Sequence, residues 1–268
     1  MELEQRSEAV EREVISSLYS NCPAATKKAL GLRVIQIDDA LLLTATHDPA
    51  IMLNRAHGLC TNKEIKPSTI QKIAATYTAL GIKHYFLHLY IDDQPQASRQ
   101  QLINAGLIAT RGWMRFIRDN AAPDEIATDL RVEKINSEHA GEFARIACEA
   151  FDMSEAAAPL IAALANDPCW HLYASFDGQT MVGTGATFVH DEIAWLDWGA
   201  TAPQYRCKGS QSAIMAARIN DAKSLGCKHI VTETGEAVEG DPQHAYHNII
   251  KHGFAEMRVR QNYTRQSS

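Results

Sequence analysis

Apolar positions along the first half of the chain follow the spacings of helices and short strands. Residues three and four apart, such as Ile70, Ile73 and Tyr77, predict helices over residues 2–20, 67–80 and 97–105. Apolar and β-branched runs predict strands over residues 32–37, 40–46, 85–91 and 113–118, the first two joined as a hairpin at Asp38 and Asp39. The polar stretch over residues 119–125 predicts a linker.

The second half begins a new series of elements after this linker. Strands are predicted over residues 130–135, 170–176, 181–189, 193–201 and 228–234. Helices are predicted over residues 137–151, 156–165 and 210–225, with Ser137 as an N-cap and Gly226 ending the last of them.

The short segment between the strand that ends at Thr201 and the helix that begins at Ser210 is suited to an anion. Pro203 stiffens the exit from the strand by fixing its own φ. Arg206 and Lys208 add positive charge where the helix dipole is already positive. Backbone N–H groups at a helix start bind phosphate groups, so this loop predicts a phosphate-bearing ligand.

This segment, Thr201-Ala-Pro203-Gln-Tyr-Arg206-Cys-Lys-Gly209-Ser-Gln211, resembles motif A of the GNAT family, the Gcn5-related N-acetyltransferases. The family motif is Val-x-Pro-x-x-Arg/Gln-x-x-Gly-x-Gly/Ala, and Pro203, Arg206 and Gly209 match it. Thr201 stands where valine is usual, and Gln211 stands where a small residue is usual. The Gln211 side chain either crowds a bound pyrophosphate or points away and leaves its backbone amide available.

The end of the chain carries a second resemblance. Asn248-Ile-Ile-Lys-His-Gly253-Phe254 is similar to the Arg-Asn-x-x-x-x-Gly-Phe ending of bacterial two-domain members, in which a helix precedes Gly-Phe and a last strand follows. The resemblance covers residues 128–265 well. Leu53-Asn54-Arg55-Ala-His-Gly58-Leu59 and Leu102-Ile-Asn-Ala-Gly106-Leu107 look like parts of a degenerate half, and the sequence offers Arg55 no chemical partner.

The resemblance implies an α/β fold of two tandem GNAT-like lobes, residues 1–124 and 125–268, each a mixed β-sheet flanked by helices. It implies transfer of an acetyl group from acetyl-CoA to a primary amine by direct attack on the thioester. A strand edge would pair with pantetheine and the loop would hold the pyrophosphate, which makes the implied cofactor-binding residues Gly199, Ala200, Thr201, Arg206, Cys207, Lys208, Gly209, Ser210 and Gln211. The first lobe would close the acceptor cleft or mediate a homodimer.

Three residues are candidates for proton transfer. Asp197 lies mid-strand among apolar neighbours, where a carboxylate is costly unless it is paired or faces a cleft, so it is either a general base or a structural hydrogen-bonding group. Glu233, near the end of the next strand, is a comparable base. The family often has a tyrosine that acts as the general acid at the position of Ile249. Tyr246, one turn earlier, is either its replacement or a packing residue.

Gly199 either lets a ligand approach the backbone or marks a bulge beside Trp198.

Charge and composition narrow the function further. Residues 1–125 carry 14 basic and 14 acidic residues, whereas residues 126–268 carry 12 and 18, so the whole net charge of −6 lies in the half with the phosphate loop. This disfavours nucleic acid as a partner and is compatible with steering of a cationic amine, or simply with solubility. No apolar run spans a membrane and no signal peptide is recognisable, so we expect a cytoplasmic protein.

Two other sites are not expected. The six cysteines lie far apart, which favours free thiols over disulfides or zinc. His244 and His247 are one helical turn apart but lack a third ligand, so no metal site is expected.

Two alternatives to the enzyme remain at this point. Gln211 in the loop and Ile249 at the tyrosine position are compatible with an inactive acyl-CoA-binding sensor or interaction protein. A general nucleotide-phosphate module is disfavoured because the loop lacks Gly-x-x-x-x-Gly-Lys-Ser/Thr. The acceptor is left open among small amines, amino acids, antibiotics, and protein N-termini or lysines.

Overall fold

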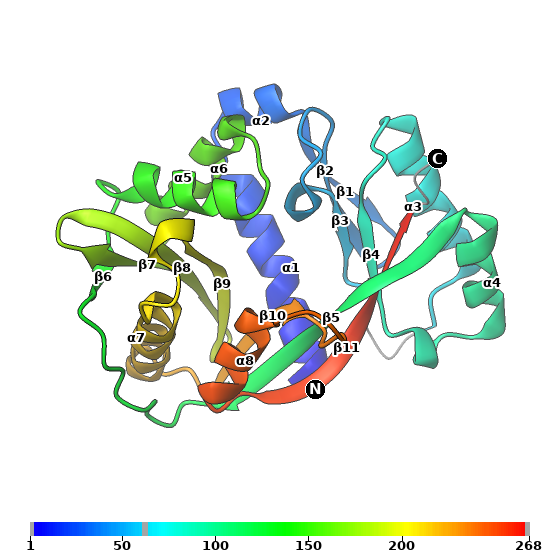
Figure 1. The fold of residues 1–268 in the computed structure, drawn as a ribbon. Helices are drawn as coiled ribbons and strands as arrows, with labels where there is room; N and C mark the ends of the chain where they lie inside the picture. The colour runs from blue at the N-terminus through cyan, green and yellow to red at the C-terminus, as the bar shows by residue number, and fades with distance from the viewer. Residues whose placement is uncertain (1–2, 61–63, 266–268) are drawn as a thin grey trace.

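The computed structural model describes residues 3–60 and 64–265. Within these residues the strands form one mixed sheet in the order β1-β2-β3-β4-β11-β5-β10-β9-β8-β7-β6 (Figure 1). The strands are β1 (Leu32–Ile37), β2 (Ala40–Ala45), β3 (Arg55–His57), β4 (Phe86–Leu89), β5 (Leu107–Asp119), β6 (Arg131–Ile135), β7 (Trp170–Asp177), β8 (Thr180–His190), β9 (Ile193–Thr201), β10 (His229–Gly235) and β11 (Ala255–Arg265).

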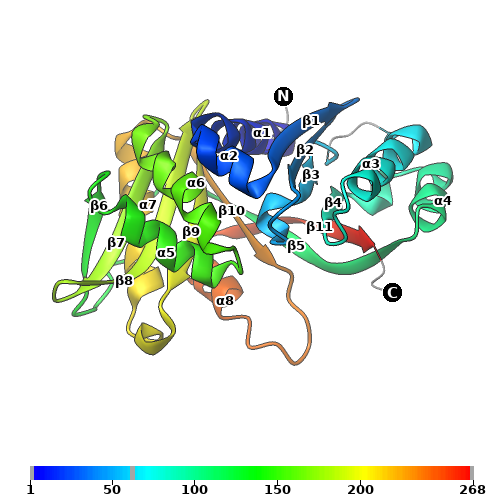
Figure 2. The same cartoon turned by 90° about the horizontal axis from the view of Figure 1, so that it is seen from above.

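Helices cover both faces of the sheet. They are α1 (Leu3–Asn21), α2 (Ala24–Leu30), α3 (Pro67–Ala79), α4 (Gln96–Asn104), α5 (Ala140–Ala150), α6 (Ala158–Ala162), α7 (Ser210–Ser224) and α8 (His244–Lys251). On one face, α1, α5 and α6 pack in a common core with Trp195 and Val231, and on the other face α7 and α8 pack against Leu196 and Phe254 (Figure 2). No helix of the described residues has both the length and the apolar character needed to cross a membrane.

The predicted elements are present with a few corrections. The strand predicted from residue 113 begins instead at Leu107, because the half-exposed residues that precede 113 pair with β11 although they lack an apolar alternation. The helix predicted over residues 156–165 is α6 between two 3-10 segments. The helix predicted from Ser137 begins at Ala140, and its N-cap is His139. The short elements α2 and β3 were not predicted, since seven and three residues are too few to show a period.

The two halves of the chain exchange strands at the centre of the sheet. β5, from the first half, pairs antiparallel with β10 of the second half, from His229 opposite Asp119 to Gly235 opposite Trp113. β11, at the end of the chain, pairs with β4 of the first half as well as with β5. The predicted α/β class with a mixed sheet flanked by helices is confirmed, and the sheet is continuous between the halves. Side chains from both halves therefore meet on its central strands.

Candidate active site

Strands β9 and β10 diverge in the second half of the chain. They pair in parallel only where residues 193–195 face residues 229–231, although β9 continues to Thr201 and β10 to Gly235. Beyond the paired residues, Asp197 and Glu233 lie on the sheet face that carries Trp195 and Val231, because side chains alternate along a strand. Among the described residues, no strand pairs with this edge of β9 beyond Trp195.

A β-bulge interrupts β9 at this divergence. Thr184 and Ala186 of β8 face Ala200 and Asp197, so β9 carries one extra residue, and Trp198 has a φ of 52°. Arg218, buried on α7, donates from Nη1 to the carbonyl oxygens of Ala186 and Asp197, each at 3.2 Å. Burial lowers the pKa of Arg218 to about 10. This guanidinium stabilises the bulge by joining the carbonyl oxygens of both strands beside it. The bulge that Gly199 was expected to mark is present, and the approach of a ligand to Gly199 stays a prediction.

The loop before α7 presents backbone N–H groups. After a 3-10 turn (Pro203–Tyr205), Cys207 and Gly209 have φ values of 64° and 84°. In the described part of the chain, no hydrogen bond engages the backbone N–H groups of residues 207–212. Thr128, in the segment between β5 and β6, donates to the carbonyl oxygen of Lys208 at 2.8 Å and so braces the loop. Left-handed residues beside a helix N-terminus form a concave anion-binding surface.

Basic side chains stand beside these N–H groups. The Arg206 side chain is exposed and makes no hydrogen bond or ion pair with the described residues. Lys208 lies 3.3 Å from the Asp177 carboxylate and 4.9 Å from the centre of the Tyr205 ring. Cys207 is an exposed free thiol between them. The loop therefore offers both N–H donors and positive charge to a phosphate.

Gln211 points away from this loop. Its Nε2 donates to the carbonyl oxygen of Ala200 at 2.6 Å and to Oγ1 of Thr201 at 3.0 Å. A Cβ atom on Gly199 would lie 3.0 Å from Oε1 of Gln211, so the glycine makes room for this side chain. Of the two orientations that the sequence allowed, Gln211 has the one that leaves its backbone amide available.

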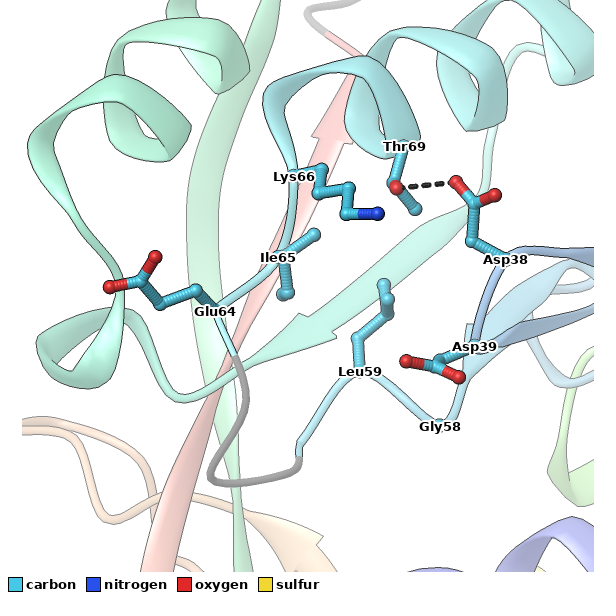
Figure 3. A pocket seen from close by; sticks show the side chains of 8 residues that line it. All are labelled: Asp38, Asp39, Gly58, Leu59, Glu64, Ile65, Lys66 and Thr69. Atoms are coloured by element: carbon cyan, nitrogen blue, oxygen red, sulfur yellow. Dashed lines mark hydrogen bonds between the residues drawn. The ribbon is translucent and has the colours of Figure 1, made fainter.

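The first half repeats this arrangement, but acidic residues outnumber basic ones around the corresponding helix N-terminus. β3 is antiparallel to β2 and parallel to β4, with α3 between β3 and β4, as α7 lies between β9 and β10. At the N-terminus of α3 a cavity of about 70 Å³ is lined by Asp38, Asp39, Gly58, Leu59, Glu64, Ile65, Lys66 and Thr69 (Figure 3). The Asp38 carboxylate accepts a hydrogen bond from Thr69 at 2.6 Å and pairs with Lys72 at 3.2 Å. Carboxylates at this position repel phosphate, so the α7 loop is the better anion site of the two.

A cluster of buried charges lies where the halves meet, on the same face as Asp197. We call this the central cluster, and it comprises Glu8, Glu11, Arg55, His57, Arg115, Glu233 and Arg260. Glu11 of α1 lies 2.7 Å from Arg115 of β5 and 2.7 Å from Arg260 of β11, and both guanidiniums are fully buried. Burial alone would raise the pKa of Glu11, but Arg260 and Arg115 hold it well below its usual range.

Glu233 and Asp197 have different environments at this cluster. The Glu233 carboxylate is hydrogen-bonded to Arg260 and lies 3.7 Å from both Arg55 and Arg115. Asp197 accepts a hydrogen bond from its neighbouring Trp198 N–H at 2.8 Å. Burial raises the pKa of Asp197, and the Arg55 charge opposes this rise. Glu233 is therefore paired with guanidiniums, whereas Asp197 binds a proton more readily than an ordinary aspartate does.

Tyr246 lies apart from these carboxylates. Its ring packs edge-to-face on Phe116, 4.9 Å away, in the core between the sheet and α7 and α8, on the opposite face from Asp197. Its hydroxyl donates to Glu256, and burial with this hydrogen bond raises the pKa of Tyr246 to about 12. Ile249 is buried in the same core. The structure thus brings Asp197 and Glu233 together and leaves Tyr246 elsewhere.

Two residues of the site were missed from the sequence. Arg218 stands four residues after Ile214 and four before Ala222 on the buried face of α7, and a charge on an apolar stripe was a usable signal. Asn248 of α8 accepts a hydrogen bond at 2.7 Å from Ser212 in the first turn of α7, and only its place in the Asn-x-x-x-x-Gly-Phe phrase pointed to it.

His57 is expected to make the fold sensitive to acid. Burial lowers the pKa of His57 from 6.5 to about 4. Between pH 6.5 and about pH 4, His57 takes up a proton in the unfolded chain but not in the folded chain. The contribution of neutral His57 to the unfolding free energy is therefore full above pH 6.5 and is lost as the pH falls towards 4. The loss is about 3 kcal/mol at about 1.36 kcal/mol per pKa unit. The unfolding free energy in urea, measured at about pH 7.5 and about pH 4.5, should therefore fall less in His57→Gln than in the wild type.

The exposed His84 provides the control for this experiment. His84→Gln should keep the wild-type dependence on pH. An equal loss of stability in His57→Gln and the wild type would show that His57 does not carry this proton linkage.

Comparisons with known proteins agree with this architecture. Residues 133–254 match the model of the acetyltransferase (GNAT) family. No curated protein matches the chain. A GCN5-related N-acetyltransferase from Kribbella flavida superposes with a TM-score of 0.69 at 12% identity, over 100% of this chain and 97% of that one.

Two further solved structures share the fold at low identity. A functionally unknown conserved protein from Staphylococcus epidermidis has a TM-score of 0.59 at 8% identity, over 92% of this chain and 100% of that one. A tandem GNAT protein from the clavulanic acid biosynthesis pathway has a TM-score of 0.52 at 8% identity, over 73% of this chain and 67% of that one. The resemblance expected from residues 201–211 and 248–254 is confirmed at the level of family model and fold.

Proposed function

We propose that this chain, whose residues 133–254 match the model of the acetyltransferase (GNAT) family, transfers an acetyl group from acetyl-CoA to a primary amine. The main support is the loop before α7, where the N–H groups of residues 207–212 have no partner in the described chain and stand beside the open edge of β9. A pyrophosphate on these donors would direct the rest of the acyl carrier into the divergence of β9 and β10.

In this proposal the loop and the strand bind different parts of acetyl-CoA. The N–H groups beside Gly209 hold the pyrophosphate, with Arg206 and Lys208 adding charge. The edge of β9 from Gly199 to Thr201 pairs with pantetheine as an added strand would. The bulge, fixed by Arg218, turns backbone amides of β9 towards the thioester carbonyl, which they polarise.

Acetyl-CoA supplies a thioester whose carbonyl carbon forms a bond with the amine nitrogen as the carbon–sulfur bond breaks and CoA leaves as a thiolate. Asp197 takes the proton that the amine nitrogen loses, directly or through water, and its raised pKa suits this task. Glu233 holds the surrounding arginines instead, because its carboxylate is hydrogen-bonded to Arg260 and lies 3.7 Å from Arg55 and Arg115. Tyr246 is left out of the reaction, since a thiolate leaves without an acid when the thiol pKa is about 8.5.

Asp197→Asn is expected to lower kcat by roughly 100-fold or more, the usual contribution of a positioned base. Asparagine keeps the shape and the acceptor for Trp198 N–H but cannot take a proton. Because burial raises the pKa of Asp197, the wild-type rate should fall with acidification above the usual carboxyl range, and this limb should vanish in the variant. The measurement is kcat by thiol release across pH.

The control for this variant is Asp191→Asn, at an exposed position of the β8–β9 turn. Both variants should bind acetyl-CoA as the wild type does. An unchanged kcat in Asp197→Asn would remove the residue from the role of base.

A sensor that binds acyl-CoA without turnover is the alternative. It is supported by the engagement of Tyr246 with Glu256 and by the buried Ile249 at the position where the family often has a tyrosine. Amine-dependent thiol release separates the enzyme from the sensor, since only the enzyme releases CoA faster when amine is added.

A further inference from the structure

Arg55 is a buried cation with few contacts. It comes from β3, in the first half of the chain, and is 5% exposed. Its Nη1 lies 3.7 Å from Glu233, beyond hydrogen-bond range, and its Nε has no partner. The guanidinium stands 5.1 Å from the centre of the Trp113 ring. Within the described chain Arg55 therefore has an ion pair at long range and a ring contact, but no hydrogen bond.

The neighbouring arginines are better paired than Arg55, although their Nε atoms also lack a partner in the described chain. Arg115 and Arg260 each bond to Glu11 at 2.7 Å, and each bonds to a second carboxylate. Helix α1 supplies Glu8 and Glu11 to this part of the central cluster, and no described residue of α1 bonds to Arg55. A buried guanidinium has five donors in a fixed plane, and leaving them unbonded is costly unless another acceptor arrives.

The surroundings of Arg55 place it on the acceptor side of the proposed reaction. It belongs to the same sheet face as Glu233 and its charge acts on Asp197. Trp113 and Phe86, which meet edge-to-face at 5.9 Å, are only partly buried beside it. The sheet face that carries Glu233 thus combines the N–H donors of Arg55, two partly buried aromatic rings and the proposed base.

We propose that Arg55 binds the carboxylate of the acceptor, which makes the acceptor an amine that also carries a carboxylate, as a free amino acid does. The planar fork of a guanidinium matches a carboxylate with two parallel hydrogen bonds. Glu233 lies too far away to take both positions and holds the guanidinium in orientation. This inference rests on the proposed acetyl transfer and assigns the first half a substrate-selecting residue.

The test compares amino acids with their decarboxylated analogues: lysine with cadaverine, histidine with histamine, and phenylalanine with phenethylamine. Thiol release with acetyl-CoA gives kcat/KM for each. The wild type should prefer the amino acid at least about tenfold in the pairs that it uses, as expected when a buried fork loses its partner. Arg55→Met should bring each pair close to parity, Arg55→Lys should keep part of the preference, and the affinity for acetyl-CoA should not change.

Arg33→Met, at an exposed position of β1, is the matched control and should keep the wild-type preference. The wild-type comparison is decisive by itself, so an Arg55 variant that fails to fold leaves the inference testable. An equal or higher kcat/KM for the decarboxylated analogues would overturn this inference and leave the acetyltransferase function standing. Binding of acetyl-CoA without turnover of either set would overturn this inference, and failure with every other class of amine as well would overturn the acetyltransferase function.

Discussion

Gly209→Val is expected to weaken the binding of acetyl-CoA by about tenfold to about 100-fold. Calorimetric titration measures this change in affinity. Gly209 has a φ of 84°, and a Cβ atom there would lie 3.2 Å from Cβ of Thr128, which braces the loop. A β-branched residue disfavours this backbone, so the loop must shift and its N–H groups must turn. One charge-assisted hydrogen bond is worth roughly 1.5–3 kcal/mol, which corresponds to this range of affinities.

Gly226 provides a control at the other end of the same helix. Its φ is 82° and no heavy atom lies within 4 Å of the position that a Cβ atom would take, so Gly226→Val carries similar backbone strain without touching the loop. Both variants should lose similar stability on heating, of the order of 1–2 kcal/mol, and Gly226→Val should bind acetyl-CoA normally. Equal affinities for the two variants would mean that the α7 loop is not where the pyrophosphate binds.

Glu11→Ala is expected to destabilise the fold by about 3–5 kcal/mol, a large part of the usual stability of a domain. Glu11 bonds to both Arg115 and Arg260, and these guanidiniums are fully buried. Removing the carboxylate leaves two charges with fewer counter-ions and no access to water, which costs more than the pair itself contributes. Urea unfolding at neutral pH measures the loss.

Glu13→Ala is the matched substitution, because Glu13 is an exposed residue of the same helix. It should change the unfolding free energy by less than about 0.5 kcal/mol. A loss below about 1 kcal/mol in Glu11→Ala would show that the remaining carboxylates, Glu8 and Glu233, compensate for it and that α1 is not held by this ion pair.

Local features of the site were predictable from the sequence. Pro203, Arg206 and Gly209 lie within seven residues, so the loop and its helix are encoded together, and the structure has α7 beginning where the sequence predicted. The orientation of Gln211 was not predictable, because it depends on the carbonyl oxygen of Ala200 becoming accessible beside the bulge.

The features that could not be predicted from the sequence depend on contacts between distant segments. The exchange of β5 and β11 depends on pairing between segments more than 100 residues apart, for which no local pattern exists. Arg260 and Glu11 are 249 residues apart, so the central cluster could not be assembled from the sequence. Arg55 was noted without a partner, and its partners proved to be Glu233 and Trp113, which the fold brings from strands β10 and β5.

Acetyl transfer itself is tested most directly by amine-dependent release of CoA. The protein is incubated with acetyl-CoA and pools of amino acids, polyamines, aminoglycosides and lysine-containing peptides, while the free thiol is followed and the products are identified by mass. The account predicts that at least one pool raises thiol release above the amine-free rate, yields an N-acetylated product, and loses this effect in Gly209→Val. Tight binding of acetyl-CoA with release unchanged by every pool would contradict it and would make the chain an acyl-CoA sensor.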